Sequence, residues 1–307
     1  MNCEICGGQI EIQANGKGMC MTCGTTYSIE YLRKLLCNNP TQSNRISPTN
    51  SNDFEIVAGT LIIYHGNSRR VIVPEGVVEI ADSAFHDMAY LESIQLPTTL
   101  LSIGQYAFSG CKSLVNISIP TRVTSIGSCA FSNCNSLQKI ILPNSITTLG
   151  SHVFHRCTNL KEITFSNNLK VIPMGAFESC ESLVNVTIPE KVDLIEKNAF
   201  IYCYSLKNLT ISSTVKTIED GAFAWCKNLR EVHLPDSIDI PNYDHPFTGC
   251  EKLKKVSYPS HLSPQIFFQT PWYDNKSKEL IQKGICPFCG GHLSIFGKKC
   301  KTCGKSY

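Results

Sequence analysis

Hydrophobic residues recur along the chain with a period of 23 residues. Phenylalanine marks the period, followed six residues later by leucine and, in seven of eight units, three residues later by cysteine. The phenylalanines are Phe85, Phe108, Phe131, Phe154, Phe177, Phe200 and Phe223, and Phe247 follows after 24 residues. Five apolar columns stay in register over the eight units. This regularity predicts a repeat solenoid, in which stacked units share one continuous core.

Each unit also contains an apolar–polar–apolar triplet that usually ends at a proline, as in Ile117-Ser118-Ile119-Pro120. Alternation with period 2 predicts a short β-strand that points two side chains inward and one outward. A second apolar pair follows, such as Val123 and Ile126. The segment through Ala-Phe to Cys is too short for a full helix. We therefore expect parallel strands joined by short helical or 3-10 returns.

Both ends of the solenoid need a cap, because an end unit has no neighbour to cover its apolar edge. Residues 54–73 are expected to form a hairpin cap around the turn His65-Gly66-Asn67. At the other end, the aromatic-rich segment 264–273 breaks the period and is expected to close the core. The predicted solenoid domain is therefore 54–273.

Seven of the 17 cysteines follow the repeat period, and we expect them to be buried core thiols. Eight others form two groups of paired Cys-x-x-Cys motifs outside the repeat. A two-residue gap lets one turn present two sulfurs, and Zn²⁺ prefers four such thiolates in a tetrahedron. The predicted ligands are Cys3, Cys6, Cys20 and Cys23 in one group and Cys286, Cys289, Cys300 and Cys303 in the other. Four cysteines leave no position for water, so both zinc ions are expected to be structural. Two disulfides per group would require an oxidising compartment instead.

These features divide the chain into four parts. Residues 1–36 are expected to form a zinc ribbon followed by a short amphipathic helix over 28–36. The polar segment 37–53 is expected to be a flexible linker. The solenoid over 54–273 follows, and residues 274–307 form the second zinc ribbon.

The repeat signature Ala-Phe-x-x-Cys-x-x-Leu-x-x-Ile-x-Ile-Pro resembles the BspA-like leucine-rich repeats, and the cysteine groups resemble rubredoxin-like zinc ribbons. The resemblance to the leucine-rich repeats covers roughly residues 54–273 and implies a general binding role. Members of that family are mostly described as surface or secreted proteins that bind host or matrix proteins. In such repeats the outward strand residues face the concave side. The candidate binding residues are therefore Asn116, Lys139, Glu162, Asn185, Asn208, Glu231 and His233.

Net charge suggests a nucleic-acid partner only at the C-terminal end of the chain. The whole chain carries +3, whereas residues 37–250 carry −4 and residues 251–307 carry +7. The second ribbon, with Lys298, Lys299, Lys301 and Lys305, is thus the one candidate for phosphate contacts. The first ribbon is neutral, and neither ribbon has the interleaved aromatics that stack on single strands. Nucleic-acid binding is therefore the alternative rather than the main hypothesis.

No phosphate-binding loop, nucleophile elbow or His-Glu-x-x-His motif occurs, so we expect no enzyme. His152 and His155 flank Phe154 in a return, and we interpret them as surface variants of their columns rather than ligands. The first residues show no basic segment followed by an apolar run, and no stretch would span a membrane. We therefore predict a cytoplasmic protein-interaction scaffold with no membrane partner. A surface adhesin exported by a non-standard route is a further alternative.

Overall fold

The computed structural model describes residues 10–12, 18–20, 26–27, 51–241, 244–287, 290–294 and 299–306. It divides the chain into two compact units, Met1–Ser47 and Pro48–Tyr307. The first unit contains a three-stranded antiparallel sheet of β1 (Ile10–Ile12), β2 (Gly18–Cys20) and β3 (Thr26–Tyr27). The helix predicted at 28–36 and most of the linker predicted at 37–53 lie outside the described residues.

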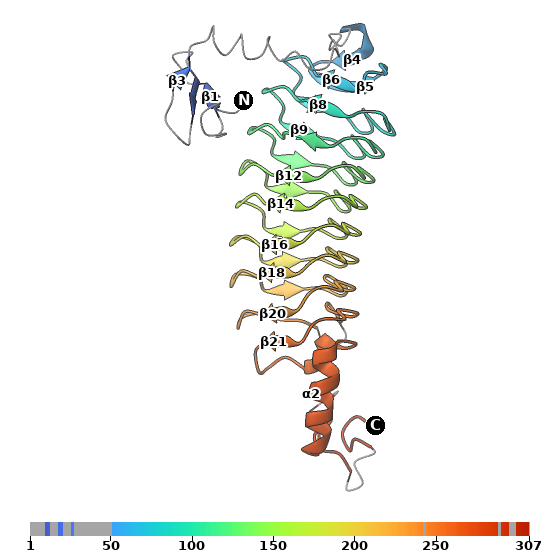
Figure 1. Ribbon diagram of the computed structural model, residues 1–307, viewed down its shortest axis with the longest axis vertical. Coiled ribbons are helices and arrows are strands. Elements are labelled where there is room, and N and C mark those ends of the chain that lie inside the picture. The colour runs from blue at the N-terminus through green and yellow to red at the C-terminus, as the bar shows by residue number, and fades with distance from the viewer. Residues whose placement is uncertain are drawn as a thin grey trace. The chain divides into compact units, whose positions relative to one another are not determined.

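The second unit is a solenoid whose rungs stack along one axis (Figure 1). Every apolar–polar–apolar triplet contributes one parallel strand, with the apolar residues turned inward as predicted. We call these the triplet strands. They are β6 (Arg70–Ile72), β8 (Ser93–Gln95), β10 (Asn116–Ile117), β12 (Lys139–Ile141), β14 (Glu162–Thr164), β16 (Asn185–Thr187), β18 (Asn208–Thr210), β20 (Glu231–His233) and β21 (Lys255–Ser257).

A second series of strands was not predicted. The second apolar pair of each unit places its last residue in a short strand that bonds in parallel to the rung above and below. These strands are β7 (Glu79–Ile80), β9 (Ser102–Ile103), β11 (Ser125–Ile126), β13 (Thr148–Leu149), β15 (Val171–Ile172), β17 (Leu194–Ile195) and β19 (Thr217–Ile218). At one end of the series, β7 pairs with β5 (Thr60–Tyr64), a strand of the predicted cap hairpin. The core is thus enclosed by strands on two sides.

The expected helical returns are replaced by turns: between residues 81 and 241 the structure contains no helix. The hydrogen bonds of the return around Phe154 show why. The N–H of Cys157 donates to the carbonyl of Phe154 at 3.1 Å within the rung, but the N–H of Phe154 donates to Ala176 on the next rung at 2.8 Å. Because alternate N–H groups bond between rungs, a continuous helical ladder cannot form.

The phenylalanine column forms the centre of the core. Successive rings from Phe85 to Phe247 are stacked with centroids 5.1–5.6 Å apart, and all are fully buried. Tyr64 extends the stack at one end and Phe267 at the other. Offset aromatic stacking at this spacing stabilises beyond area burial alone.

The N-terminal cap is a hairpin of β4 (Phe54–Val57) and β5, but its turn lies at Ala58-Gly59 rather than at His65-Gly66-Asn67. Both turn residues have positive φ, 49° and 82°, which a tight turn requires. The loop after β5 instead carries the chain to β6 on the other side of the core.

The C-terminal cap consists of the 3-10 helix η2 (Pro264–Phe267) and α2 (Pro271–Gln282). The Thr270 hydroxyl accepts a hydrogen bond from the N–H of Tyr273 at 3.1 Å, which caps α2. Helix α2 continues past residue 274, where the second ribbon was expected to begin. Among the described residues, no helix has the length and apolar character to cross a bilayer.

Candidate functional site

The predicted binding residues lie together on the outer side of the triplet strands. Strand pairing aligns Asn116 with Lys139, Lys139 with Glu162, and Asn185 with Asn208. Glu231 and His233 lie on β20, beside Lys255 and Ser257 of β21. The outward position of each strand follows from its alternation, because the neighbouring apolar residues occupy the core.

Polar side chains on this face pair with one another from rung to rung. Lys139 Nζ lies 2.9 Å from Glu162 Oε2, and Asn208 Nδ2 donates to Asn185 Oδ1 at 2.6 Å. His233 bridges Glu231 at 3.0 Å and Ser257 at 2.8 Å. Exposed pairs of this kind contribute only ~0–1 kcal/mol each to stability. They bring together side chains of adjacent rungs on the face that a partner would meet.

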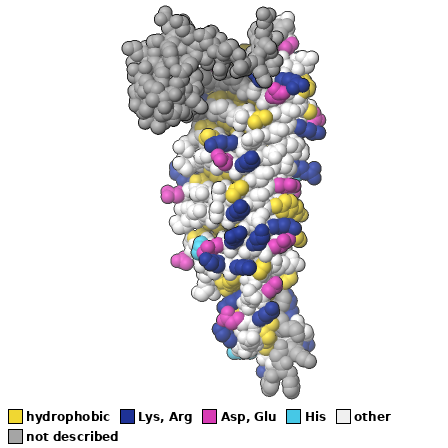
Figure 2. Space-filling view, viewed as in Figure 1, with side chains coloured by type: hydrophobic (Ala, Val, Ile, Leu, Met, Phe, Trp, Pro, Cys, Tyr) yellow, Lys and Arg dark blue, Asp and Glu magenta, His cyan; other side chains and the backbone are white. Residues whose placement is uncertain are grey.

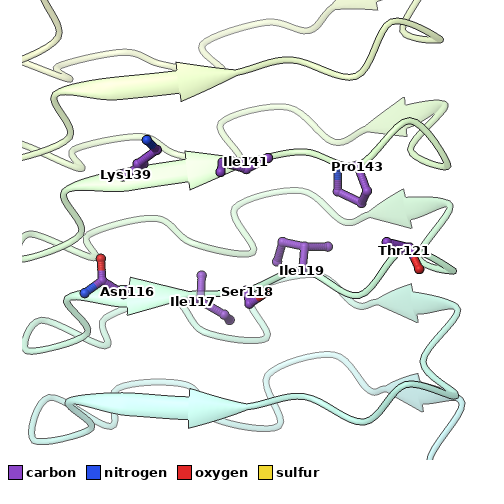
Figure 3. A pocket seen from close by; sticks show the side chains of 8 residues that line it. All are labelled: Asn116, Ile117, Ser118, Ile119, Thr121, Lys139, Ile141 and Pro143. Carbon is purple, nitrogen blue, oxygen red and sulfur yellow. The ribbon is translucent and has the colours of Figure 1, made fainter. Parts of the chain in front are cut away.

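Isoleucine interrupts the polar face at two outward positions, Ile72 of β6 and Ile141 of β12, which are 45 % and 54 % exposed. Of these two isoleucines, Ile141 lies beside a hollow. It borders a shallow hollow of about 310 Å³ between β10 and β12, which Asn116, Ser118, Lys139 and Pro143 also line (Figure 3). The candidate site is therefore an apolar spot with polar groups around it, the arrangement that protein interfaces favour at their centre.

An aromatic cluster on the returns was missed by the sequence analysis. Tyr202 and Trp225 are 23 residues apart and occupy the same column, both with positive φ. Lys227 Nζ lies 5.7 Å from the Tyr204 ring centroid and 5.8 Å from that of Trp225, and 2.9 Å from Glu251 Oε1. A cation already covers these ring faces. The sequence does contain a signal for this cluster, because Tyr202 and Trp225 occupy equivalent positions in successive repeat units.

Three of the predicted zinc ligands converge in the C-terminal part. The sulfurs of Cys286, Cys300 and Cys303 all lie within 4.8 Å of one another, and those of Cys286 and Cys303 are 3.8 Å apart. Zn–S bonds of ~2.3 Å in a tetrahedron separate two sulfurs by about 3.8 Å, so the spacing fits zinc. The N–H groups of Thr302 and Cys303 point at the Cys300 sulfur at 3.3 and 3.4 Å.

The fourth ligand of this group, Cys289, lies outside the described residues. Gly290 and Gly304, which follow the paired cysteines, have φ of 68° and 72°, as knuckle turns require. In the first unit, Cys20 lies on β2, whereas Cys3, Cys6 and Cys23 lie outside the described residues.

The seven cysteines of the repeat behave differently. Each is buried, and each thiol donates to the carbonyl of a phenylalanine on the preceding rung, as Cys157 does to Phe131 at 3.2 Å. Burial raises the pKa of the Cys157 thiol to about 12. These thiols are packing groups, as the sequence analysis predicted, and are poor nucleophiles.

Comparison with known proteins identifies the repeat. Residues 78–207 and 193–269 match the BspA type Leucine rich repeat region. No curated protein matches the chain. Among solved structures, a leucine-rich repeat protein of T. pallidum is 29 % identical with a TM-score of 0.56, covering 60 % of this chain and 91 % of that one. One from Bacteroides ovatus is 27 % identical with a TM-score of 0.56, covering 62 % of this chain and 55 % of that one. The chain belongs to the family of BspA-type leucine-rich repeat proteins.

Proposed function

We propose that this chain is a protein-interaction scaffold that binds its partner through the triplet strands around Ile141. The exposed isoleucine beside the hollow of β10 and β12 is the observation that carries this proposal. Leucine-rich repeat proteins generally bind other proteins, and the family membership supports the same role. Catalysis forms no part of the proposal.

The energetics favour a small apolar anchor with a polar surround. Fully burying an isoleucine side chain is worth about 1.5–3 kcal/mol. Some of the neighbouring polar side chains already pair with one another, such as Lys139 with Glu162, which lowers the cost of ordering them on binding. On the face turned to the viewer in Figure 2, Lys and Arg lie interspersed with Asp and Glu, which suits a protein partner better than a polyanion.

Two structural zinc ions are part of the proposal. Cys286, Cys289, Cys300 and Cys303 would hold one, and Cys3, Cys6, Cys20 and Cys23 the other. The convergence of three C-terminal sulfurs supports the first site. We place the protein inside the cell, because reduced buried thiols and thiolate zinc ligands suit a reducing compartment. Elemental analysis of chelator-free protein should find about two zinc per chain.

The test compares capture from native cell extract by the wild-type chain and two matched variants. Ile141→Asp places a charge at the anchor, whereas Ile72→Asp does so at an exposed isoleucine, 45 % exposed, in the same column on β6. We expect wild-type and Ile72→Asp to retain the same nuclease-resistant protein, and Ile141→Asp to lose it. Equal capture by all three would refute the proposed anchor.

Nucleic-acid binding by the C-terminal end is the second candidate, favoured by its charge of +7 and the exposed Lys299 and Lys301. Each phosphate contact makes affinity fall with salt. We expect only weak binding of mixed RNA or DNA in fluorescence anisotropy between about 50 and 200 mM salt. Tight binding at the higher salt, abolished by reversing the charges of Lys298, Lys299, Lys301 and Lys305, would establish this second function instead.

A further inference from the structure

Two histidines and a glutamate meet on the returns of the solenoid. His152 and His155 lie on one return, and Glu178 lies on the next, 23 residues after His155. Glu178 Oε2 is 3.5 Å from His152 Nδ1, and its Oε1 is 4.0 Å from His155 Nε2. The carboxylate therefore stands between two imidazoles, and all three side chains are half-buried.

A hydrogen bond orients the ring of His155. Its Nδ1 lies 3.3 Å from the hydroxyl oxygen of Ser132 on the preceding rung, and that oxygen also accepts from Asn133 Nδ2 at 3.2 Å. If Nδ1 carries the proton and donates to Ser132, Nε2 keeps its lone pair and faces Glu178. Metal-binding histidines are held in the same way, by an outer partner on the nitrogen that does not bind the metal.

In this tautomer two acceptors face each other. His155 Nε2 and Glu178 Oε1 lie 4.0 Å apart and cannot hydrogen-bond to each other, but a cation between them would satisfy both. Desolvation by partial burial is the largest influence on the pKa of His155 and lowers it, which favours the uncharged imidazole that a metal ion binds.

Glycine on the next rung makes room for the other ring. Gly175 follows His152 by 23 residues and has φ of 60°, and a side chain there would collide with the His152 imidazole. His152 itself has φ of 56°. The ring thus lies across the glycine, and this position brings Nδ1 to the carboxylate.

The distances approach those of a metal site. Bonds of ~2.0–2.1 Å in a tetrahedron separate two N or O ligands by about 3.4 Å. The two imidazole–carboxylate separations are 3.5 and 4.0 Å, so little movement is needed there. The imidazole ring centroids are 5.7 Å apart, and the ligand atoms of the three residues do not all lie within 4.8 Å of one another. Binding of one ion by all three residues therefore requires a movement of one imidazole.

We propose that His152, His155 and Glu178 bind a divalent transition-metal ion, with water in the remaining coordination positions. Two imidazoles and one carboxylate are ligands that zinc and nickel share. The ion would link two adjacent rungs on the returns. The site is separate from the cysteine groups and does not depend on what the triplet strands bind.

A hydrolytic role for the same residues is excluded by access. Ser132, His155 and Glu178 do form a hydroxyl–imidazole–carboxylate series. However, Ser132 is only 5 % exposed and already accepts a hydrogen bond from Asn133. A substrate carbonyl could not approach its oxygen, so Ser132 acts as a positioning residue.

The test titrates Ni²⁺ into the tag-free, full-length, zinc-loaded chain by isothermal titration calorimetry. We expect one Ni²⁺ per wild-type chain and a Kd raised at least about tenfold in His155→Ala and in the nearly isosteric Glu178→Gln. Ser132→Ala should weaken binding about 10–100-fold if it orients the ring. The control is His233→Ala, which removes another exposed histidine beside a glutamate and should leave Kd unchanged.

A second measurement locates the ion. In spectra of ¹⁵N-histidine-labelled protein, paramagnetic Ni²⁺ should broaden the signals of His152 and His155 before those of His233. Circular dichroism melting of each metal-free variant verifies that it folds. The proposal is overturned if wild-type protein binds no Ni²⁺, if His155→Ala and Glu178→Gln bind as tightly as wild type, or if His233→Ala removes the binding.

Discussion

Cysteine occupies two regions of this chain under opposite conditions. In the solenoid, seven cysteines form what we call the thiol ladder, one per rung, and each donates to a backbone carbonyl inside the core. At the C-terminal end, Cys286, Cys300 and Cys303 form what we call the thiol cluster, in which the sulfurs converge on one another. The same side chain is thus a packing group in one region and a candidate metal ligand in the other.

The surroundings of the sulfurs account for the difference. The ladder lies beside a column of fully buried phenylalanines, which disfavours a thiolate and keeps the proton on the sulfur. The cluster has only a small apolar neighbourhood, with Leu293 and the partly buried Ile281. We expect a module with so small a core to depend on bound metal for its stability. The spacing of the cysteines in the sequence distinguishes the two regions. Of the two, only the thiol cluster has sulfurs that converge, as metal ligands must.

Raising the pH should have the largest effect on the ladder. An unfolded thiol has a pKa of ~8.5, whereas burial raises that of Cys157 to about 12. Above pH ~8.5 the thiol of the unfolded chain loses its proton, whereas that of the folded chain keeps it. The contribution of the thiol to the free energy of unfolding is therefore fully present below the unfolded pKa, and it is lost as the pH rises towards the folded pKa. In that window, ionisation of each thiol should lower the free energy of unfolding by ~1.4 kcal/mol per pH unit, and the seven together by on the order of 10 kcal/mol per pH unit.

Urea unfolding at pH 8, 9 and 10 would measure this slope. Tyrosine and lysine titrate in the upper part of the range, so a matched variant isolates the thiol contribution. Cys157→Ala should have a shallower slope, by ~1.4 kcal/mol per pH unit, whatever its own stability at pH 8. An identical slope in the variant would show that Cys157 ionises as readily in the folded chain as in the unfolded one.

Removing a ring beside the ladder should have the next largest effect. Phe154→Ala leaves a cavity between Phe131 and Phe177, whose rings stack on it at 5.5 and 5.3 Å. We expect a loss of about 3–5 kcal/mol in the free energy of unfolding, measured by urea titration. Ile141→Ala, on the outer side of the preceding unit, should change the free energy of unfolding by less than ~0.5 kcal/mol. Similar losses in both variants would contradict the assignment of the core.

Chelation should affect the thiol cluster and spare the ladder. We expect a zinc chelator to remove amide hydrogen-exchange protection from the described residues after 284. The melting temperature of the solenoid should shift by less than ~2 °C, because α2 and η2 close its end without metal. A cooperative collapse of the whole second unit on chelation would show that the cluster is part of the cap.

The repeat period made much of this comparison predictable. It indicated which residues enter the core, the order of the triplet strands and the packing role of the ladder cysteines. The second strand series escaped prediction, since its strands are only two residues long and their pairing depends on the neighbouring rung. The approach of His155 to Glu178 follows from the 23-residue period, but the ring directions depend on positive φ at His152 and on Gly175.

The smallest effect on stability, and the most direct test of the contrast, is alkylation of the folded, metal-free chain at pH 8. The thiolate is the reactive species, and a pKa raised from 9.0 to about 12 lowers the thiolate fraction of Cys157 roughly a thousandfold. Its sulfur is also fully buried, whereas Cys303 is exposed.

We therefore expect mass spectrometry to find Cys303 fully alkylated while Cys157 is modified to less than about 1 %, because Cys157 reacts only when the solenoid opens. Modification of Cys303 should leave the melting temperature of the solenoid unchanged. If Cys157 instead reacts as fast as Cys303, rungs in the middle of the ladder open individually, and the two regions differ in sulfur geometry but not in protection.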